Sequence, residues 1–427
     1  MSAKVENKSL LALAEEVQRE VKAISDFTVA NGSPPPSLSQ DWPNELPGEI
    51  EVSRMKLREA AKALHDIAVG PFDHLFSTAW SLHSVSTLRW IIHFKIPEAI
   101  PLSGSVPYHE IAATCGVNVS HLRRILRFCM ANRLFHEPEP DHVAHTVFSA
   151  YLVTNKVLLG QLEFLCEDSF QFSTKLVQAH ELWPNSKEAN HAAFNVACNT
   201  KLQRYAYLGQ PGQEQQAKRF GNMLEFARQE RATDVKFVAQ AYAWQDVDTL
   251  VDIGGGTGDV AIALAKEFPR LHIIVEDKAH SISVGESGLP LELRSRIQLV
   301  ERDFFSPRPV ETEAICKTKT FFLRMVLHNW PDKDVGGIIR HLLPSVRAGA
   351  RLLIMEMMLP PPGTVPENME WWMRSLDMEM MVEFNSRVRS KEDWEKLFEG
   401  ISPGLVMKSA NTPYGSGLTI MEFGFKK

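Results

Sequence analysis

The sequence predicts a protein in two parts, a helical N-terminal half and an α/β C-terminal half built on a Rossmann-like, mostly parallel sheet. Its 427 residues are long for one domain and comfortable for two. Up to about residue 245 the apolar residues recur at helical spacing, whereas from Thr249 onward short apolar runs alternate with helical segments. That alternation is typical of βαβ units, whose strands pair in parallel.

The charge and cysteine content argue against several classes of protein. The formal net charge of −6 is spread along the chain, so we expect no nucleic-acid partner, because such binding depends on clustered Lys and Arg. The five cysteines lie far apart and form no C-x-x-C pair, which favours a reducing compartment. No apolar run suits a signal peptide or a membrane span, so we expect a cytoplasmic location and no membrane partner.

The first 48 residues are expected to form a helical arm and a linker. Apolar residues from Leu10 to Ile24 recur at helical spacing and predict an amphipathic helix over about 9–27. The stretch 31–48 carries five prolines and is predicted to be extended. The arm helix could pack on its own domain or on a partner subunit, and both interpretations stay open.

Residues 49–220 are expected to form a helical domain that contains a winged helix between residues 107 and 151. Its helices and strands are predicted at 109–116, at 119–134, around Phe135 and around Val143. DNA reading is the alternative role for such a layout. The local basic cluster is only Arg123, Arg124 and Arg127, and the apolar residues between them suit a core, so a structural role is favoured.

The remaining helical segment leads into the second domain. Residues 151–245 are predicted to be nearly continuous helix, interrupted at 183–185 and at 209–212, where Pro and Gly occur. The boundary is placed near residue 220, so the α/β domain is expected to span residues 221–427.

The glycine-rich stretch LVDIGGGTGDVAIALA combines an apolar strand, a tight turn and a helix. A dinucleotide fingerprint fits on Gly256, Gly258 and Ala261, so NAD stays possible. The alternative pattern is G-x-G-x-G, which begins at Gly254 and has Asp252 on the preceding strand. Asp252 would repel a pyrophosphate but could attract the ammonium of S-adenosylmethionine. The stretch therefore favours S-adenosylmethionine over NAD.

Two acids at later strand ends predict a nucleoside cofactor. Asp277 ends the next predicted strand, 19 residues after Gly258, where a carboxylate can accept both ribose hydroxyls. The strand at 297–302 leads to Asp303 and Phe304, where an acid can bind an adenine amino group and an aromatic ring can cover its face. NAD and S-adenosylmethionine both carry such a nucleoside.

Six motifs resemble the caffeic-acid-type O-methyltransferases and their fungal polyketide and alkaloid relatives. They are VDIGGGTGD, IIVED, RDFF, LRMVLHNWPD, LLIMEMMLP and RVRSKEDW, in this order and spacing. The resemblance covers nearly the whole chain. It implies a class I methyltransferase domain with a mostly parallel seven-stranded sheet, a winged-helix dimerisation domain, a homodimer, S-adenosylmethionine as cofactor and no metal.

The resemblance also implies the catalytic residues. Methyl transfer to a hydroxyl requires alignment of donor and acceptor and removal of a proton. The family's histidine base matches His328, the carboxylate that orients it matches Glu356, and a basic position that contacts the cofactor matches Arg324. Two positions depart from the family, which has Asp where this chain has Asn329 and Glu where it has Val388.

The substrate pocket is expected on the segment 371–382. By resemblance its pocket-lining residues include Trp372, Met373, Met378 and Met381, which suit an aromatic or polyketide-like substrate. The simpler interpretation is an ordinary amphipathic helix.

Three functions follow from these motifs. The first is O-methylation of an aromatic or polyketide-derived metabolite. The second is a pericyclase or dehydratase that keeps the cofactor without transferring methyl, as in some fungal relatives, and Asn329 and Val388 motivate it. The third is a non-catalytic winged-helix regulator that senses the cofactor, and the lack of a basic face argues against it.

Overall fold

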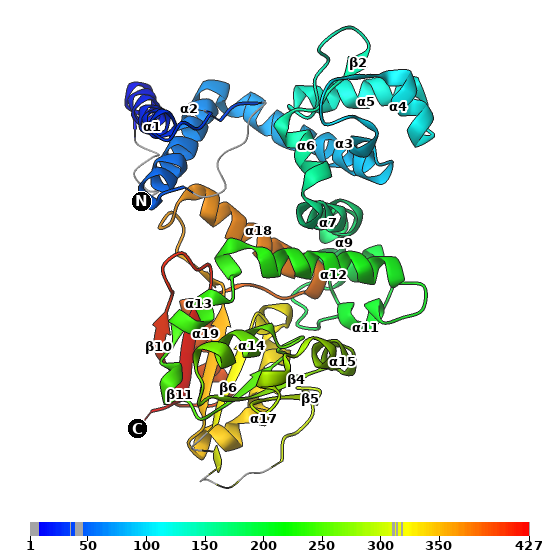
Figure 1. Cartoon of the computed structure of the whole chain (residues 1–427). Helices are drawn as coiled ribbons and strands as arrows, with labels where there is room; N and C mark the ends of the chain where they lie inside the picture. The colour runs from blue at the N-terminus through cyan, green and yellow to red at the C-terminus, as the bar shows by residue number, and fades with distance from the viewer. Residues whose placement is uncertain are drawn as a thin grey trace. The chain divides into compact units, whose positions relative to one another are not determined.

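The structure is a computed structural model that describes residues 8–34, 36–38, 46–309, 312, 315–316 and 319–426. The chain divides into two compact units (Figure 1). The first comprises Met1–Gln171, Gln215–Met223 and Pro362–Trp372, and the second comprises Phe172–Glu214, Leu224–Pro361 and Met373–Lys427.

The first unit begins with a helical hairpin. Helix α1 (Leu10–Ala30) packs along α2 (Gly48–Trp80), and Ser9 caps α1 by accepting the Ala12 amide at 3.2 Å (Figure 1). The predicted arm helix is therefore confirmed, and in this structure it packs on its own chain. Within the expected linker 31–48, residues 35 and 39–45 lie outside the described residues.

The predicted winged helix follows α3 (Leu82–His93) and η2 (Pro97–Ala99). Its elements are β1 (Val106–Pro107), α4 (Tyr108–Cys115), α5 (Val119–Ala131) and β2 (His142–Val143), and β1 pairs antiparallel with β2. Asn118 caps α5 by accepting the amides of Ser120 and His121. The strand expected around Phe135 is reduced to one bridge, between His136 and Ala144.

Short helices complete the middle of the chain. They are α6 (Val147–Thr154), α7 (Lys156–Phe164), the π-helix η3 (Leu165–Ser169), α8 (Phe170–Ser173), α9 (Leu176–Leu182), α10 (Ala193–Ala197), α11 (Arg204–Leu208), α12 (Glu214–Gln229), η4 (Arg231–Thr233), α13 (Lys236–Ala241) and η5 (Trp244–Asp246).

The structure has the predicted interruptions at 183–185 and 209–212, but nearly continuous helix over the rest of 151–245 is wrong, because residues 186–192 and 198–203 are not helical either. Asn195 explains the break at 198–203. Its amide donates to the carbonyls of Thr200 and Leu202 at 3.1 and 2.8 Å, so the backbone finds partners outside a helix.

A mostly parallel seven-stranded sheet forms the second unit, as predicted, among the residues described. The strand order is β10-β11-β7-β6-β3-β4-β5, and only the pairings of β11 are antiparallel. The strands are β3 (Thr249–Ile253), β4 (His272–Asp277), β5 (Ile297–Glu301), β6 (Lys319–Arg324), β7 (Arg351–Glu356), β10 (Leu405–Asn411) and β11 (Thr419–Phe425).

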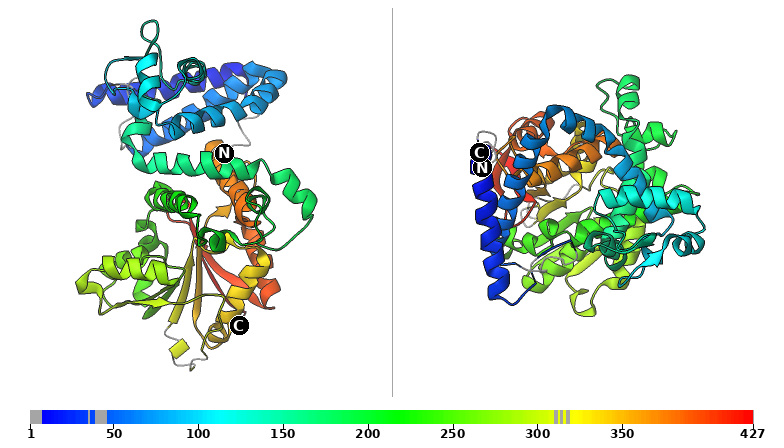
Figure 2. Two further views of the ribbon diagram at one scale, coloured as in Figure 1. Left: turned by 90° about the vertical axis from the view of Figure 1, so that its right-hand side faces the viewer. Right: turned by 90° about the horizontal axis from the view of Figure 1, so that it is seen from above.

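Helices cover both faces of this sheet (Figure 2). Alternate strand residues such as Val251, Phe321 and Leu352 share one core cluster with apolar side chains of α17 (Asp332–Arg347) and α19 (Lys391–Ile401). The other helical elements are α14 (Asp259–Glu267), α15 (Ala279–Gly288), η6 (Leu291–Leu293), η7 (Leu327–Asn329) and α18 (Glu367–Phe384), and a short pair is formed by β8 (Met358–Leu359) and β9 (Arg389–Ser390).

The polar residues of interest lie at the carboxyl ends of the parallel strands. Asp252 is the penultimate residue of β3, and Asp277, Arg324 and Glu356 end β4, β6 and β7. In open α/β sheets this edge is where ligands bind. Among the described helices, none combines the length and apolar character that a membrane span requires.

Candidate active site

The glycine turn after β3 has the conformation that the G-x-G-x-G pattern requires. Gly254, Gly256 and Gly258 have φ of 71°, 61° and 89°, in the left-handed region where a side chain is strained. A Cβ atom on Gly255 would lie 2.6 Å from Oδ2 of Asp252. The turn thus brings bare backbone close to the carboxylate at the strand end.

Asp252 is a buried acid whose side chain lacks a full set of partners. It is 2% exposed, and its Oδ2 has no hydrogen-bond partner among the described residues. Burial, followed by the nearby Asp277, raises the pKa of Asp252 to about 7, while Arg324 opposes this. A buried carboxylate without a partner suits a cationic ligand group, such as an ammonium.

Asp277 joins the turn to the neighbouring strand. Its Oδ2 accepts the Gly256 amide at 2.8 Å, and its Oδ1 accepts the Lys278 amide at 2.7 Å. An ionised carboxylate has about four acceptor positions, so two remain for the hydroxyls of a ribose. The residue therefore fits the position predicted for it.

Asp303 and Phe304 follow β5 at the same edge of the sheet. Asp303 is exposed, and its Oδ1 accepts the Phe305 amide at 2.9 Å. The ring of Phe304 packs edge-on against Trp330, with centroids 5.8 Å apart. This contact connects the expected adenine site with the turn that carries His328.

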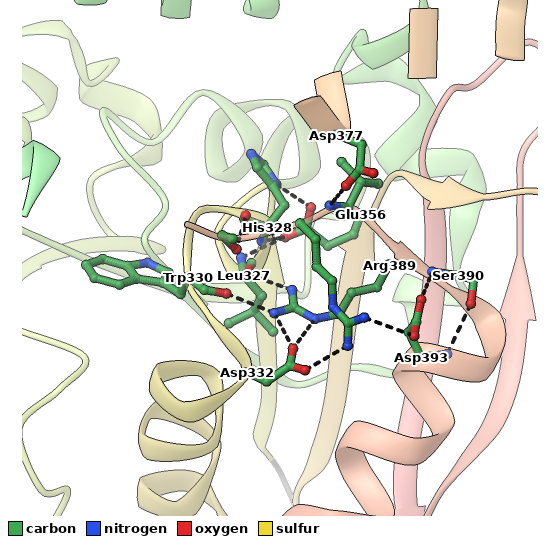
Figure 3. Close-up of polar contacts among 12 residues, drawn as sticks. Leu327, His328, Trp330, Asp332, Glu356, Asp377, Arg389, Ser390 and Asp393 are labelled. Atoms are coloured by element: carbon green, nitrogen blue, oxygen red, sulfur yellow. Dashed lines mark hydrogen bonds and ion pairs between the residues drawn. The ribbon is translucent and has the colours of Figure 1, made fainter. Parts of the chain in front are cut away.

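His328 and Glu356 are in direct contact, although 28 residues separate them in the chain (Figure 3). His328 Nδ1 lies 2.6 Å from Glu356 Oε2, and the two side chains are 13% and 1% exposed. Glu356 Oε1 accepts the amides of Val326 and Leu327 at 2.9 and 2.8 Å, and more weakly that of His328 at 3.4 Å. One carboxylate thus orients both the ring and its backbone.

Arg324 lies close to two acids at the carboxyl ends of the strands, Asp252 and Glu356. Its guanidinium donates to the carbonyl of Thr233, and its Nε is buried without a partner among the described residues. Burial lowers the pKa of Arg324, and the charges of Asp252 and Glu356 oppose this. Arg324 is therefore placed to balance both carboxylates.

The two departures from the family alter the surroundings of the histidine. Asn329 is half-buried in η7, the turn that carries His328. Val388 is 2% exposed, and its amide donates to Asp377 Oδ1 at 2.8 Å. Burial raises the pKa of Asp377. In the described structure, Glu356 is the one carboxylate in contact with the His328 ring.

The four expected pocket residues of α18 differ in burial. Met373 is 4% exposed, Met378 is 44% exposed, and Trp372 and Met381 are half-buried. At about 100° per residue they do not share one face of the helix. Their role as pocket residues stays a prediction.

Sequence reasoning missed several residues around the histidine. Tyr205 stacks on Trp330 with centroids 5.9 Å apart, and the Lys278 ammonium lies 5.4 Å from its ring centre. Ser386 and Arg389 contact the backbone of the turn that carries His328. Of Tyr205, Lys278, Ser386 and Arg389, only Arg389 lies in one of the six motifs. No local pattern in the sequence indicates which residues it contacts.

Comparison with known proteins agrees with this geometry. Residues 201–402 match the O-methyltransferase domain, and residues 76–155 match the O-methyltransferase dimerisation domain. The O-methyltransferase VdtC of Byssochlamys spectabilis is 33% identical over 99% of each chain. The O-methyltransferase bik3 of Gibberella fujikuroi is 32% identical over 97% of this chain and 92% of its own.

Solved structures share the fold. OxaC matches with a TM-score of 0.74 and 21% identity, over 97% of this chain and 99% of its own. The complex of LepI with SAM matches with a TM-score of 0.70 and 20% identity, over 97% of this chain and 100% of its own. A protein described as a pericyclic reaction enzyme matches with a TM-score of 0.68 and 20% identity, over 96% and 100%. At these identities the likeness concerns the fold alone.

The fold and the strand-end site define a class I methyltransferase. The chain belongs to the O-methyltransferase family, as its six motifs predicted, and it is an S-adenosylmethionine-dependent O-methyltransferase. The NAD alternative is thereby excluded. The dimerisation domain supports formation of a homodimer, and the methyltransferase domain implies a small-molecule substrate.

Proposed function

We propose that this O-methyltransferase methylates a hydroxyl group of an aromatic or polyketide-derived metabolite, with His328 as general base. The observation that carries the proposal is the 2.6 Å contact between His328 Nδ1 and the buried Glu356. Because an ionised carboxylate only accepts hydrogen bonds, the ring proton stays on Nδ1 and the Nε2 lone pair is available. A substrate hydroxyl at Nε2 can then lose its proton as its oxygen attacks.

The strand-end residues would hold the cofactor, and this fit is supported by Asp252 Oδ2, a buried oxygen without a hydrogen-bond partner among the described residues, beside bare glycine backbone. Bound S-adenosylmethionine supplies a methyl group on a positively charged sulfur. Asp252 would bind its ammonium and Asp277 its ribose hydroxyls, while Asp303 and Phe304 would bind the adenine. Arg324 would contact the cofactor and balance the charge of Asp252. The glycine turn, at Gly254, Gly256 and Gly258, would complete the site, because its backbone lets the cofactor approach closely where a side chain would be strained.

The chain's residues then perform one proton transfer. The substrate O–H bond would break and its proton would move to His328 Nε2, which leaves the oxygen electrons free to take the methyl group that the cofactor supplies. The electron pair of the sulfur–methyl bond would stay on the cofactor's sulfur, so that S-adenosylhomocysteine is the leaving group. Glu356 stabilises the resulting imidazolium by accepting from Nδ1. Because Glu356 is only 1% exposed, little water weakens its attraction to this charge.

The substrate class is supported by the relatives. One of them is the grayanic acid biosynthesis cluster O-methyltransferase of Cladonia grayi, 31% identical over 96% of this chain. OxaC was solved with meleagrin and with oxaline. We assign the acceptor pocket of this chain to Trp372, Met373, Met378 and Met381 of α18, whose adaptable apolar side chains suit a flat polycyclic ligand.

A second candidate function is a pericyclic or dehydrating reaction without methyl transfer. Val388, in place of the family's carboxylate, is the observation that favours it. The cofactor would then stay intact, and the product would have the substrate's mass or lack one water. Formation of S-adenosylhomocysteine in step with a product heavier by one methylene group would exclude this candidate.

The organisation of the chain is proposed as an arm and linker (1–48), a helical winged-helix dimerisation domain (49–220) and a catalytic domain (221–427). The matches at 76–155 and 201–402 support this division. The five cysteines lie far apart in the sequence and form no C-x-x-C pair, which supports the expected cytoplasmic location. We expect neither nucleic acid nor a membrane as partner.

The variant His328→Ala tests the proposed base. Turnover should fall by about 10²–10⁴-fold, the usual contribution of general-base catalysis, while cofactor affinity stays nearly unchanged. The exposed His272 provides a matched control, and His272→Ala should keep wild-type turnover. If His328→Ala retains turnover within about threefold of wild type, the assignment of the base is wrong.

A further inference from the structure

The turn that carries His328 is held from two sides (Figure 3). Glu356 accepts its amides, as described above. On the opposite side, Ser386 Oγ donates to the carbonyl of His328 itself at 2.7 Å. Arg389 donates to the carbonyls of Leu327 and Trp330 at 3.0 and 2.8 Å. The backbone on both sides of the histidine is thus fixed by side chains from the segment that follows α18.

We propose that Ser386 and Arg389 are positioning residues that aim the catalytic histidine by holding the carbonyl side of its turn. The proposal rests on the function proposed above, in which His328 removes a proton. Neither residue touches the imidazole. Their effect would pass through the backbone. By holding the carbonyl of His328 and the carbonyls of its neighbours, they would fix the backbone from which the imidazole ring projects.

Arg389 is itself rigidly placed. Its side chain has no exposed surface, and it donates through Nε and Nη2 to Asp332 Oδ1 at 2.9 and 2.8 Å. Its guanidinium also lies 5.0 Å from the ring centre of Trp394. A planar group held in this way can direct two carbonyls at once, which a lysine ammonium cannot reproduce.

The pairing of β8 with β9 explains why both supports reach the same turn. Arg389 on β9 pairs with Met358 on β8, and Met358 lies two residues after Glu356 at the end of β7, so the pairing keeps Arg389 close to the segment that carries Glu356. Arg389 also lies close enough to Glu356 for their charges to interact. Both supports therefore belong to one fixed frame around the turn.

This chain depends on that frame because Val388 removes the second carboxylate that the family places beside its histidine. Among the described residues, Glu356 is the one carboxylate partner of the ring. The ring is therefore oriented by its hydrogen bond to Glu356 and by the position of its own backbone. Met325, just before the turn, has a φ of 54°, so the backbone here is strained for a non-glycine residue. Loss of a carbonyl contact would let the turn relax and move the ring.

Ser386→Ala tests the proposal, with Ser390→Ala as its control. Ser390 lies four residues away and also makes one side-chain contact to backbone, but it caps α19 by accepting the Asp393 amide. We expect kcat of Ser386→Ala to fall by about tenfold to a hundredfold, as for a misaligned reacting group, with KM and cofactor affinity unchanged. Ser390→Ala should keep kcat within about twofold, although the loss of its cap lowers Tm.

The low-field proton resonance of the His328 Nδ1–H···Glu356 hydrogen bond gives a readout that does not require turnover. It should shift or broaden in Ser386→Ala and persist in Ser390→Ala. Absence of methyl transfer by the wild type would contradict the proposed function, and this resonance would still test the positioning. Wild-type kcat and resonance in Ser386→Ala would overturn the proposal. If that variant does not fold, Ser386→Cys, whose thiol is a weak donor, should show the same changes, and wild-type values there would overturn it.

Discussion

Cofactor affinity should rise with pH until Asp252 is ionised. Burial and the nearby Asp277 raise the pKa of Asp252 to about 7, against the effect of Arg324. Below that pH the carboxyl group is mostly protonated and offers no charge to the ammonium of S-adenosylmethionine. Binding must then release a proton. The affinity should therefore rise about eightfold between about pH 5.5 and about pH 6.5.

The free energy involved is sizeable. A rise in pKa from 3.8 to about 7 corresponds to about 4 kcal/mol of preference for the neutral form in the unliganded site. Because the folded pKa lies above the unfolded one, the folded chain holds a proton that the unfolded chain has already lost. The unliganded protein should thus lose stability as pH rises from about 4 to about 7, while its affinity for cofactor increases over the upper part of that range.

Isothermal titration of S-adenosylhomocysteine in two buffers of different ionisation enthalpy measures the affinity and the number of protons released on binding. We expect release of about one proton per ligand near pH 5.5. 5′-Methylthioadenosine, which lacks the ammonium, should release none. Asp252→Asn should bind S-adenosylhomocysteine weakly at every pH. The matched control Asp259→Asn, which changes an exposed acid at the start of α14, should behave as wild type. Equal pH dependence for both ligands would refute the role of Asp252.

Two further substitutions test neighbouring assignments. Asp277→Ala should weaken cofactor binding by about 1–3 kcal/mol, because ribose and the Gly256 amide lose an acceptor; unchanged affinity by calorimetry would contradict this. Val388→Glu should raise kcat or shift the pH–rate profile upward, because a negative charge near His328 favours imidazolium. A pH–rate profile identical to that of the wild type, in a folded variant, would show that position 388 does not act on the base.

Parallel strands gather their carboxyl ends at one edge, so the sequence alone could predict that acids at these ends lie near one another. Asp252 is the penultimate residue of β3 and Asp277 ends β4, as the apolar runs before them indicated. The alternating glycines could be assigned to a pattern, and their left-handed φ values fit it. Local patterns could not predict the contact of His328 with Glu356, because it joins two elements that are distant in the sequence. It was expected only from the resemblance to the family.

Other features depend on partners that periodicity does not reveal. Helical spacing alone could not show that Asn195 holds two carbonyls outside a helix. Arg389 and Leu327 are 62 residues apart, and a buried arginine in a charged stretch is indistinguishable from a surface one. The methionines of α18, at positions 369, 373, 378, 380 and 381, fall on several sides of the helix, so the sequence does not decide which of them face a substrate.

The choice between methyl transfer and a pericyclic reaction depends on the turn around His328, because solved structures described as a mitomycin 7-O-methyltransferase and as a pericyclic reaction enzyme share this fold. A pericyclic reaction has no net proton to accept. This chain nevertheless keeps a carboxylate with 1% exposure against the ring, which costs desolvation that a neutral side chain would avoid. It also fixes the turn with a fully buried arginine. A frame that holds Nδ1 as donor leaves Nε2 as acceptor, and such a group is useful when a hydroxyl must lose its proton. The retained His328–Glu356 pair therefore favours methyl transfer, even with Val388 in place of the second acid.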